Sequence, residues 1–172
     1  MTHRLRARTP RALLALALLT APLAACDSSG DDDSADSTFE ATVSGTAQAS
    51  LGGQAAFATQ TEDGQTVTAV GLLDRTDDED AAFLVFEGRP SAKTYRVADE
   101  EVGALLVLHG TGDEGALYVA ETGTVTLARS ETSRMTGTFD VTAVSLVDED
   151  ETVRLRGTFS AKPGTVSTPD AE

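Results

Sequence analysis

Few side chains in this sequence have the chemistry of a catalyst. Hydrolysis through a Ser or Cys nucleophile needs a nearby base, usually His, and outside the first 25 residues the only histidine is His109. No Gly-x-Ser-x-Gly elbow accompanies it, and it follows the apolar run 105–108, which is typical of a strand end facing a turn. We therefore expect no catalytic residues and a protein that is not an enzyme.

Metal and cofactor ligands are equally scarce. A zinc site needs three or four His, Cys or carboxylate ligands, and the chain has one cysteine, Cys26. The Asp and Ser residues of 27–37 have the spacing of calcium-loop fragments, but the Gly turn and the bidentate Glu of such a loop are missing. The acidic runs 77–80 and 148–151 are expected to be solvated turns. No metal, phosphate-binding loop or other cofactor site is predicted.

The amino terminus has the composition of an export signal. Four arginines fall within residues 4–11, and the fourteen residues Ala12–Ala25 are almost all Leu and Ala. A membrane-spanning helix needs about 20 apolar residues, whereas the apolar part of a signal peptide needs about 7 to 15. Residues 1–25 are therefore predicted to be a removable signal peptide.

The end of that segment, Leu23-Ala24-Ala25-Cys26, resembles the lipobox of bacterial lipoproteins. The resemblance implies cleavage between Ala25 and Cys26 and attachment of diacylglycerol to the Cys26 thiol. Each buried methylene of such a chain contributes about 0.8 kcal/mol, and two or more chains hold a protein stably on a membrane. The expected membrane partner is thus reached through lipid, without a spanning helix.

Residues 26–37 are expected to be the lipidated cysteine followed by a disordered acidic tether. The segment has no large apolar residue and cannot offset the entropy lost on ordering. In some Gram-negative groups acidic residues soon after the cysteine direct export to the outer membrane or cell surface, which is the location favoured here. In other groups an Asp at this place causes retention at the inner membrane. The possible sorting signal consists of Asp27, Asp31, Asp32 and Asp33.

The charge of the chain limits its partners. The formal net charge is −15, and because four of the 13 basic residues lie in the signal segment, the remainder carries −19. Such a surface repels phosphate backbones, and no basic patch with interleaved aromatic residues is visible in the sequence, so nucleic-acid binding is not expected. An acidic, lysine-poor composition is also typical of proteins adapted to salt.

After residue 37 the sequence changes to short runs rich in Val, Thr, Phe and Leu, separated by Gly and acidic residues. In 38–47 apolar and polar residues alternate with the period of two expected of a half-buried strand. Helical periodicity is absent. Ten strands are predicted: 38–47, 54–60, 66–73, 81–87, 93–98, 103–109, 116–120, 124–128, 134–147 and 152–161.

The connections between these strands predict the fold class. Most are too short for the crossover that parallel pairing needs, so the strands are expected to be antiparallel neighbours. The sequence therefore predicts an all-β domain at 38–163, an antiparallel meander of about eight to ten strands closed into a barrel or sandwich, with the barrel preferred, and a flexible tail at 164–172. The expected turns are 62–64, 88–90, 112–115, 121–123 and 148–151.

Two Gly-Thr-Phe triplets, 137–139 and 157–159, are predicted to lie on paired strands joined by the turn at 148–151. A Gly inside a strand usually marks a bulge or bend, and the Phe is expected in the core. If the fold is a barrel, its interior is expected to be filled rather than open. The residues predicted to fill it are Phe57, Leu73, Phe83, Val85, Phe86, Phe139 and Phe159.

With 39–45, 95–97 and 123–127, these triplets resemble the motifs of a family of small, uncharacterised β-rich bacterial lipoproteins. The resemblance spans most of 38–162 and implies a β-rich fold but no known activity or catalytic residues. Many members have an aromatic residue early in the second strand region, where this chain has Ala55 and Ala56.

The sequence therefore predicts a lipid-anchored cell-envelope protein whose acidic β domain is a non-enzymatic binding or structural module, with an unknown envelope protein as its possible partner. Two alternatives stay open. One is a calycin-like carrier of a small apolar ligand, because barrels of about eight strands can hold one small molecule. The other is a calcium-stabilised adhesion-type module that uses the acidic loops.

Overall fold

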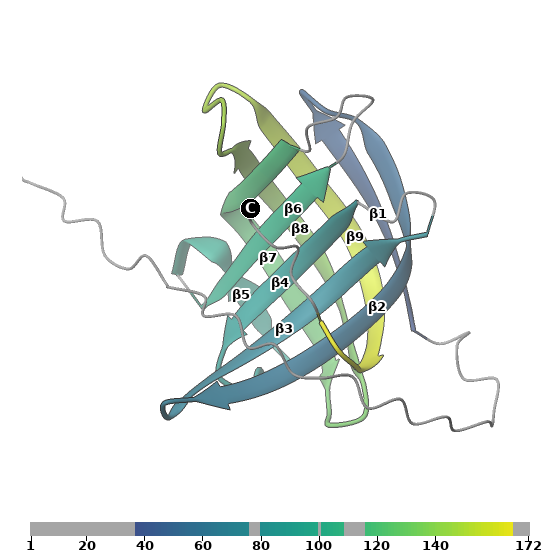
Figure 1. Cartoon of the computed structure of the whole chain (residues 1–172), viewed down its shortest axis with the longest axis vertical. Helices are drawn as coiled ribbons and strands as arrows, with labels where there is room; N and C mark the ends of the chain where they lie inside the picture. The colour runs from purple at the N-terminus through teal and green to yellow at the C-terminus, as the bar shows by residue number, and fades with distance from the viewer. Residues whose placement is uncertain (1–36, 76–79, 100, 109–115, 167–172) are drawn as a thin grey trace, which may run out of the picture. The chain divides into compact units, whose positions relative to one another are not determined.

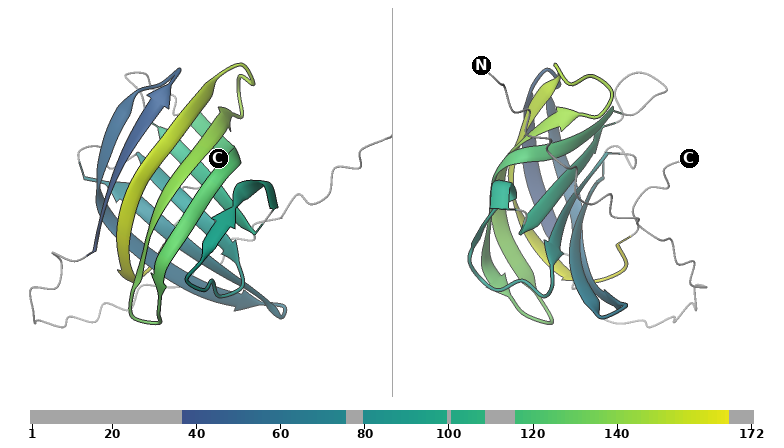
Figure 2. Two further views of the ribbon diagram at one scale, coloured as in Figure 1. Left: turned by 180° about the vertical axis from the view of Figure 1, so that it is seen from behind. Right: turned by 90° about the vertical axis from the view of Figure 1, so that its left-hand side faces the viewer.

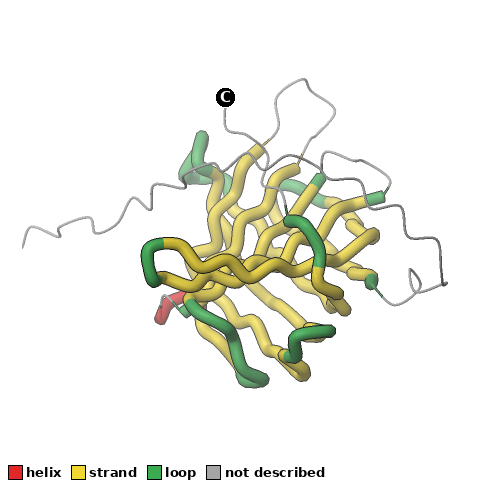
Figure 3. Tube along the Cα trace, turned by 60° about the horizontal axis from the view of Figure 1, so that its bottom comes forward, coloured by secondary structure: helices red, strands yellow, loops and turns green. Residues whose placement is uncertain are grey.

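A computed structural model describes residues 37–75, 80–99, 101–108 and 116–166. These residues form nine strands and one 3₁₀ turn, η2 (Val97–Asp99), and no helix among them is long and apolar enough to cross a bilayer. Figure 3 shows that strands make up most of the described chain. The strands are β1 (Thr38–Gly45), β2 (Ala49–Glu62), β3 (Gln65–Asp74), β4 (Ala81–Glu87), β5 (Thr94–Arg96), β6 (Val102–Leu108), β7 (Ala116–Ser130), β8 (Met135–Ser145) and β9 (Thr152–Pro163).

Eight of these strands close into an antiparallel barrel in the order β1-β2-β3-β4-β6-β7-β8-β9, with β9 returning to β1 (Figure 1). The short β5 is an additional strand. It pairs with residues 124–126 of β7. The earlier residues 116–119 of β7 pair with β6. The all-β class and the barrel closure predicted from the sequence are confirmed.

The strands form where apolar and polar residues alternate. In β1 every second residue from Phe39 to Val43 is buried, and β8 and β9 repeat this pattern. The inward side chains of all eight strands meet in one core. An eight-stranded barrel is just wide enough to be filled by its own side chains.

The turn between β2 and β3 is a two-residue turn in which both Asp63 and Gly64 have positive φ, 50° and 81°. Positive φ at both positions defines a type I′ turn, whose twist matches that of the flanking strands. The predicted turn at 62–64 is therefore confirmed. The turn at 148–151 is confirmed too, since the Glu151 amide donates to the Asp148 carbonyl oxygen between β8 and β9.

The turn predicted at 121–123 is wrong. β7 runs without a break from Ala116 to Ser130, and the ladder with β8 skips one residue between Ala120 and Thr122. Glu121 is thus the extra residue of a β-bulge, which bends a strand without ending it. Gly123 follows with φ of 125°, and a Cβ there would lie 2.3 Å from the Asp140 carbonyl oxygen. Two predicted strands, 116–120 and 124–128, are therefore one.

The two Gly-Thr-Phe triplets lie opposite each other on β8 and β9. Gly137 pairs with Phe159, and Phe139 pairs with Gly157. The rings of Phe139 and Phe159 stack with their centroids 6.4 Å apart. Each glycine leaves room for the phenyl ring of the other triplet. The predicted irregularity is present at Gly137, which lies opposite the register shift between Leu127 and Arg129 in the β7–β8 ladder, and absent at Gly157.

The chain beyond β9 stays on the barrel as far as Val166. The Gly164 amide donates to the Phe57 carbonyl oxygen at 3.0 Å, and the Val166 side chain packs beside Gly71 on β3. Residues 164–166, predicted to begin a flexible tail, therefore contact the outer surface because β3 offers a glycine at the point of contact. Residues 167–172 lie outside the described part.

Candidate functional site

The residues predicted to carry the anchor lie outside the described part of the chain. They are the cleavage pair Ala25 and Cys26 and the possible sorting residues Asp27, Asp31, Asp32 and Asp33. His109 also lies outside it. The described ranges contain no His and no Cys, so the strands themselves supply neither an imidazole base nor a thiol nucleophile.

Within the described ranges no three His, Cys, Asp or Glu side chains come together as metal ligands. The acidic run at 77–80 was expected to be solvated, and Asp80, its one described member, is buried instead. Asp74, at the end of β3, is buried as well, and its amide donates to the Asp80 carbonyl oxygen at 3.0 Å. This backbone bond draws the two ends of the β3–β4 connection together, which places Asp80 against the barrel.

The interior of the barrel holds four of the seven residues predicted to fill it: Phe57, Phe86, Phe139 and Phe159. Leu73, Phe83 and Val85 were predicted there wrongly. Successive side chains of a strand point to opposite faces, so Val85 and Phe86 cannot both point inward. Register places Leu73, Phe83 and Val85 on the outer face, where Leu73 is 45% and Val85 39% exposed.

An apolar outer face therefore covers β3, β4, β6 and the first part of β7, the strands that cross the front of Figure 1. Phe83 packs there with Val107 and Leu105, and Val166 covers part of this cluster. Phe83 is 1% exposed although it points away from the barrel interior. The face is thus an accessory core closed in part by the C-terminal end of the described chain.

A polar outer face lies on the opposite side, on β9, β8 and β7, which the left view of Figure 2 shows side by side. At its centre Arg154 donates from Nε and Nη2 to the two carboxylate oxygens of Asp140, both at 2.7 Å. Arg156 approaches the same carboxylate at 3.6 Å. The hydrogen bond from Arg154 lowers the pKa of Asp140 below its ordinary value of 3.8, and the charges of Arg154 and Arg156 act in the same direction.

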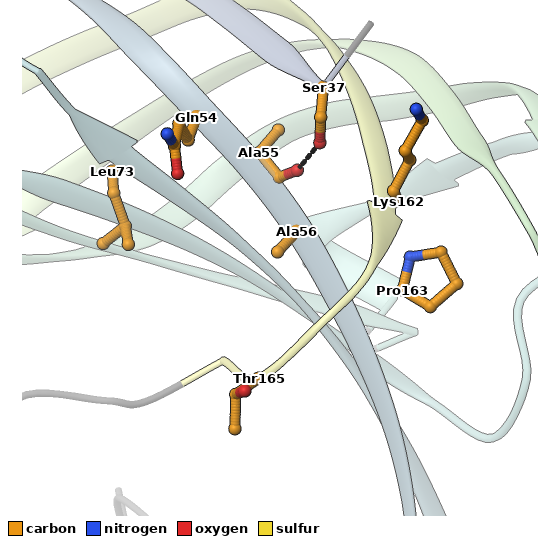
Figure 4. Close-up of a pocket in the computed structure, with 8 residues that line it drawn as sticks. All are labelled: Ser37, Gln54, Ala55, Ala56, Leu73, Lys162, Pro163 and Thr165. Atoms are coloured by element: carbon orange, nitrogen blue, oxygen red, sulfur yellow. Dashed lines mark hydrogen bonds between the residues drawn. The ribbon is translucent and has the colours of Figure 1, made fainter. Parts of the chain in front are cut away.

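One hollow of about 230 Å³ lies where β1 begins, between β2 and the end of β9 (Figure 4). Ser37 donates a hydrogen bond to the Ala55 carbonyl oxygen across it. Ala55 and Ala56 line its wall, together with Leu73 from β3 and Lys162 from β9. The small side chains of β2 create this space, at the place where the family resemblance implies an aromatic residue.

A second hollow of about 290 Å³ lies beside β5. Lys93 donates to Glu101 at 2.8 Å, and its ammonium lies 4.5 Å from the centre of the Tyr95 ring. The hydrogen bond to Glu101 raises the pKa of Lys93. The Tyr95 hydroxyl is already engaged, because it accepts from the Ser91 amide and donates to the Ser91 carbonyl oxygen. These contacts hold the β4–β5 connection in place.

Compared with known proteins, the chain matches no family model, no curated protein and no solved structure. The resemblance to lipoproteins therefore stays a prediction from the sequence. The described structure itself offers a filled barrel with two outer faces of opposite character, one apolar and one polar.

Proposed function

We propose that the protein is a lipid-anchored cell-envelope protein whose barrel is a non-enzymatic binding or structural module. The observation that carries this proposal is the lone cysteine directly after Leu23-Ala24-Ala25, at the end of an apolar stretch of fourteen residues. That stretch is too short to span a bilayer and has the length of a signal peptide. Lipid on Cys26 would then be the membrane anchor.

The barrel supports a module that works through its outside. Large inward side chains such as Phe86, Phe139 and Leu84 are at most 2% exposed, and they pack with the other inward residues in a single core. Among the described residues, the two hollows lie at the rim and beside β5 rather than along the barrel axis. This arrangement favours a surface-binding module over a calycin-like carrier.

The outer membrane or the cell surface is the proposed location. The acidic residues Asp27 and 31–33 directly follow the anchor position, and residues 27–36 lie between it and Ser37, which is hydrogen-bonded to β2 and so is not part of the tether. A flexible chain of ten residues spans about 16 to 19 Å, enough to hold the barrel clear of the head groups.

Intact mass spectrometry of the chain from a washed membrane fraction tests the anchor. The expected mass is that of residues 26–172 plus diacylglycerol and an amide-linked acyl chain. Cys26→Ser is the control, and it should keep its leader and lack the lipid. Wild-type protein that carries a bare Cys26 and leaves the membrane on washing would overturn the proposal.

A further inference from the structure

The fold gathers basic side chains that are scattered in the sequence. Nine Lys and Arg residues follow the signal segment, and four of them point outward from one continuous part of the barrel wall. We call this part the Arg–Thr face and define it by the outward residues of β5, 122–126 of β7, 136–142 of β8, 152–162 of β9 and 38–44 of β1. Its charged members are Arg96, Arg154, Arg156 and Lys162, against Glu40 and Asp140.

Strand register arranges the Arg–Thr face in rows. One row runs Arg96, Thr124, Asp140, Arg156 and Thr42, each paired with the next across neighbouring strands. The adjacent row runs Thr94, Thr126, Thr138, Thr158 and Glu40. With strands about 4.8 Å apart, Arg96 and Arg156 are separated by about 14 Å, and Arg154 and Arg156 by about 7 Å along β9.

The guanidinium groups of this face differ in what they contact. Arg154 is held by both oxygens of Asp140, whereas Arg156 reaches the carboxylate only at 3.6 Å and its side chain is 72% exposed. Arg96 is exposed on β5. Asp140 thus binds Arg154 through two hydrogen bonds and Arg156 only through a longer ion pair, and the side chains of Arg96 and Arg156 are exposed.

The chemistry of the face selects one class of partner. Every outward side chain in these stretches is Thr, Ser, Arg, Lys, Asp or Glu, and the nearest outward aliphatic side chains, Val144 and Val119, lie at one end of the face beside Thr152. A protein partner would therefore find no aromatic or large aliphatic anchor at the centre of the face. Nucleic acid would find no aromatic platform on which its bases could stack. The face itself carries four basic side chains against two acidic ones, so it is locally positive on an acidic molecule. A bilayer would find nothing to take into its apolar layer.

With those three classes of partner disfavoured, the face best suits a hydrated polymer that carries both hydroxyl and carboxylate groups. Guanidinium groups bind carboxylates through paired, charge-assisted hydrogen bonds, and threonine hydroxyls both donate to and accept from sugar hydroxyls. Resting on the proposed function, we propose that the Arg–Thr face is the binding surface of the module and that its partner is an acidic polysaccharide of the cell envelope. The anchor would hold this face within reach of such a polymer.

Titration with polygalacturonate of residues 26–172, produced in soluble form without the leader and with Cys26→Ser, tests the proposal, and dextran is the neutral polymer. Binding is expected for polygalacturonate alone, and it should weaken as salt rises. Arg96→Ser/Arg156→Ser should raise the dissociation constant at least tenfold. Arg75→Ser/Arg89→Ser removes the same charge from exposed positions outside the face and should change it less than twofold.

Arg154 is left in place in these variants so that Asp140 keeps its partner, and circular dichroism confirms that both double variants fold. Equal losses in the two double variants, binding to dextran, or no binding of polygalacturonate at low salt would each overturn the inference. These outcomes are separate from the anchor test, which measures the intact mass of the membrane-bound chain and does not involve the polymer.

Discussion

The reciprocal Gly-Phe pairs on β8 and β9 show how single residues determine the packing of this barrel. Phe139 lies over Gly157, and a Cβ on Gly157 would lie 2.6 Å from Phe139 Cζ and 2.3 Å from the Glu40 carbonyl oxygen. One of these contacts is with backbone, which cannot turn aside as a flexible side chain can. Gly157 is therefore required because a side chain at this position would clash with β8 on one side of β9 and with β1 on the other.

Gly157→Ala should lower the free energy of unfolding by about 1 to 3 kcal/mol, the usual cost of adding atoms to a filled core. Urea denaturation followed by circular dichroism measures this change. Gly103→Ala on β6 is the matched control, because nothing lies within 4 Å of its added Cβ, and it should stay within about 0.5 kcal/mol of wild type. Equal effects of the two substitutions would contradict the packing argument.

The Asp140 carboxylate gives a residue-scale prediction about pH. Its pKa is lower in the folded protein than in the unfolded chain, because Arg154 donates two hydrogen bonds to it. The unfolded state therefore binds more protons as pH falls, so the contribution of Asp140 to stability is present above the ordinary pKa of 3.8 and is lost below it.

Asp140→Asn should accordingly cost less than about 1 kcal/mol at pH 7, as expected of a surface ion pair, and the difference from wild type should shrink as pH falls below 3.8. Thermal unfolding between pH 2.5 and pH 7 at constant ionic strength checks this. A gap between the two proteins that widens toward low pH would show that the carboxylate does not act through Arg154.

At the scale of elements, the β2–β3 hairpin depends on left-handed backbone at two neighbouring residues. Nothing lies within 4 Å of a Cβ built on Gly64, so a cost of Gly64→Ala would come from its φ of 81° and not from a clash. We expect about 1 kcal/mol of lost stability. Asp63→Asn should be nearly neutral, because Asn adopts positive φ readily. Equilibrium unfolding of both variants compares them, and an unaffected Gly64→Ala would argue against a type I′ turn.

Alternation and turn residues predicted most of these elements from the sequence. β4 was predicted with its observed ends, and β3, β6, β8 and β9 to within two residues. β2 was predicted too short because Gly52 and Gly53 disfavour a strand locally, whereas pairing with β1 extends it. β7 was divided in two because Glu121-Thr122-Gly123 has the composition of a turn, and only its ladder with β8 shows the bulge.

The two outer faces were not predicted, for different reasons. The apolar face had a signal, since Val85 and Phe86 are adjacent and alternation sends one of them outward. The row from Arg96 to Arg156 had no signal in the sequence. Its members become neighbours only through the register of four strands that are spread over sixty residues. Period-two alternation alone indicates only that Arg154 and Arg156 share a face.

At the scale of the whole molecule, acidity opposes compactness. Residues 26–172 carry a formal charge of −19, so the folded state repels itself unless salt screens it. Raising NaCl from 0.02 to 0.5 M should therefore raise the melting temperature by a few degrees. At fixed ionic strength, calcium and EDTA should leave it unchanged, and a rise specific to calcium would favour the adhesion-type alternative instead.

We propose that lipid on Cys26 is the only attachment of this barrel to a membrane. Digestion of washed, protein-bearing membranes with a protease that cuts before Asp tests it most directly, because the acidic segment 27–36 joins the anchor to the folded body. A fragment containing 38–163 should be released intact while the acylated Cys26 peptide sediments with the bilayer. A barrel that stays with the membrane after the cut would contradict it.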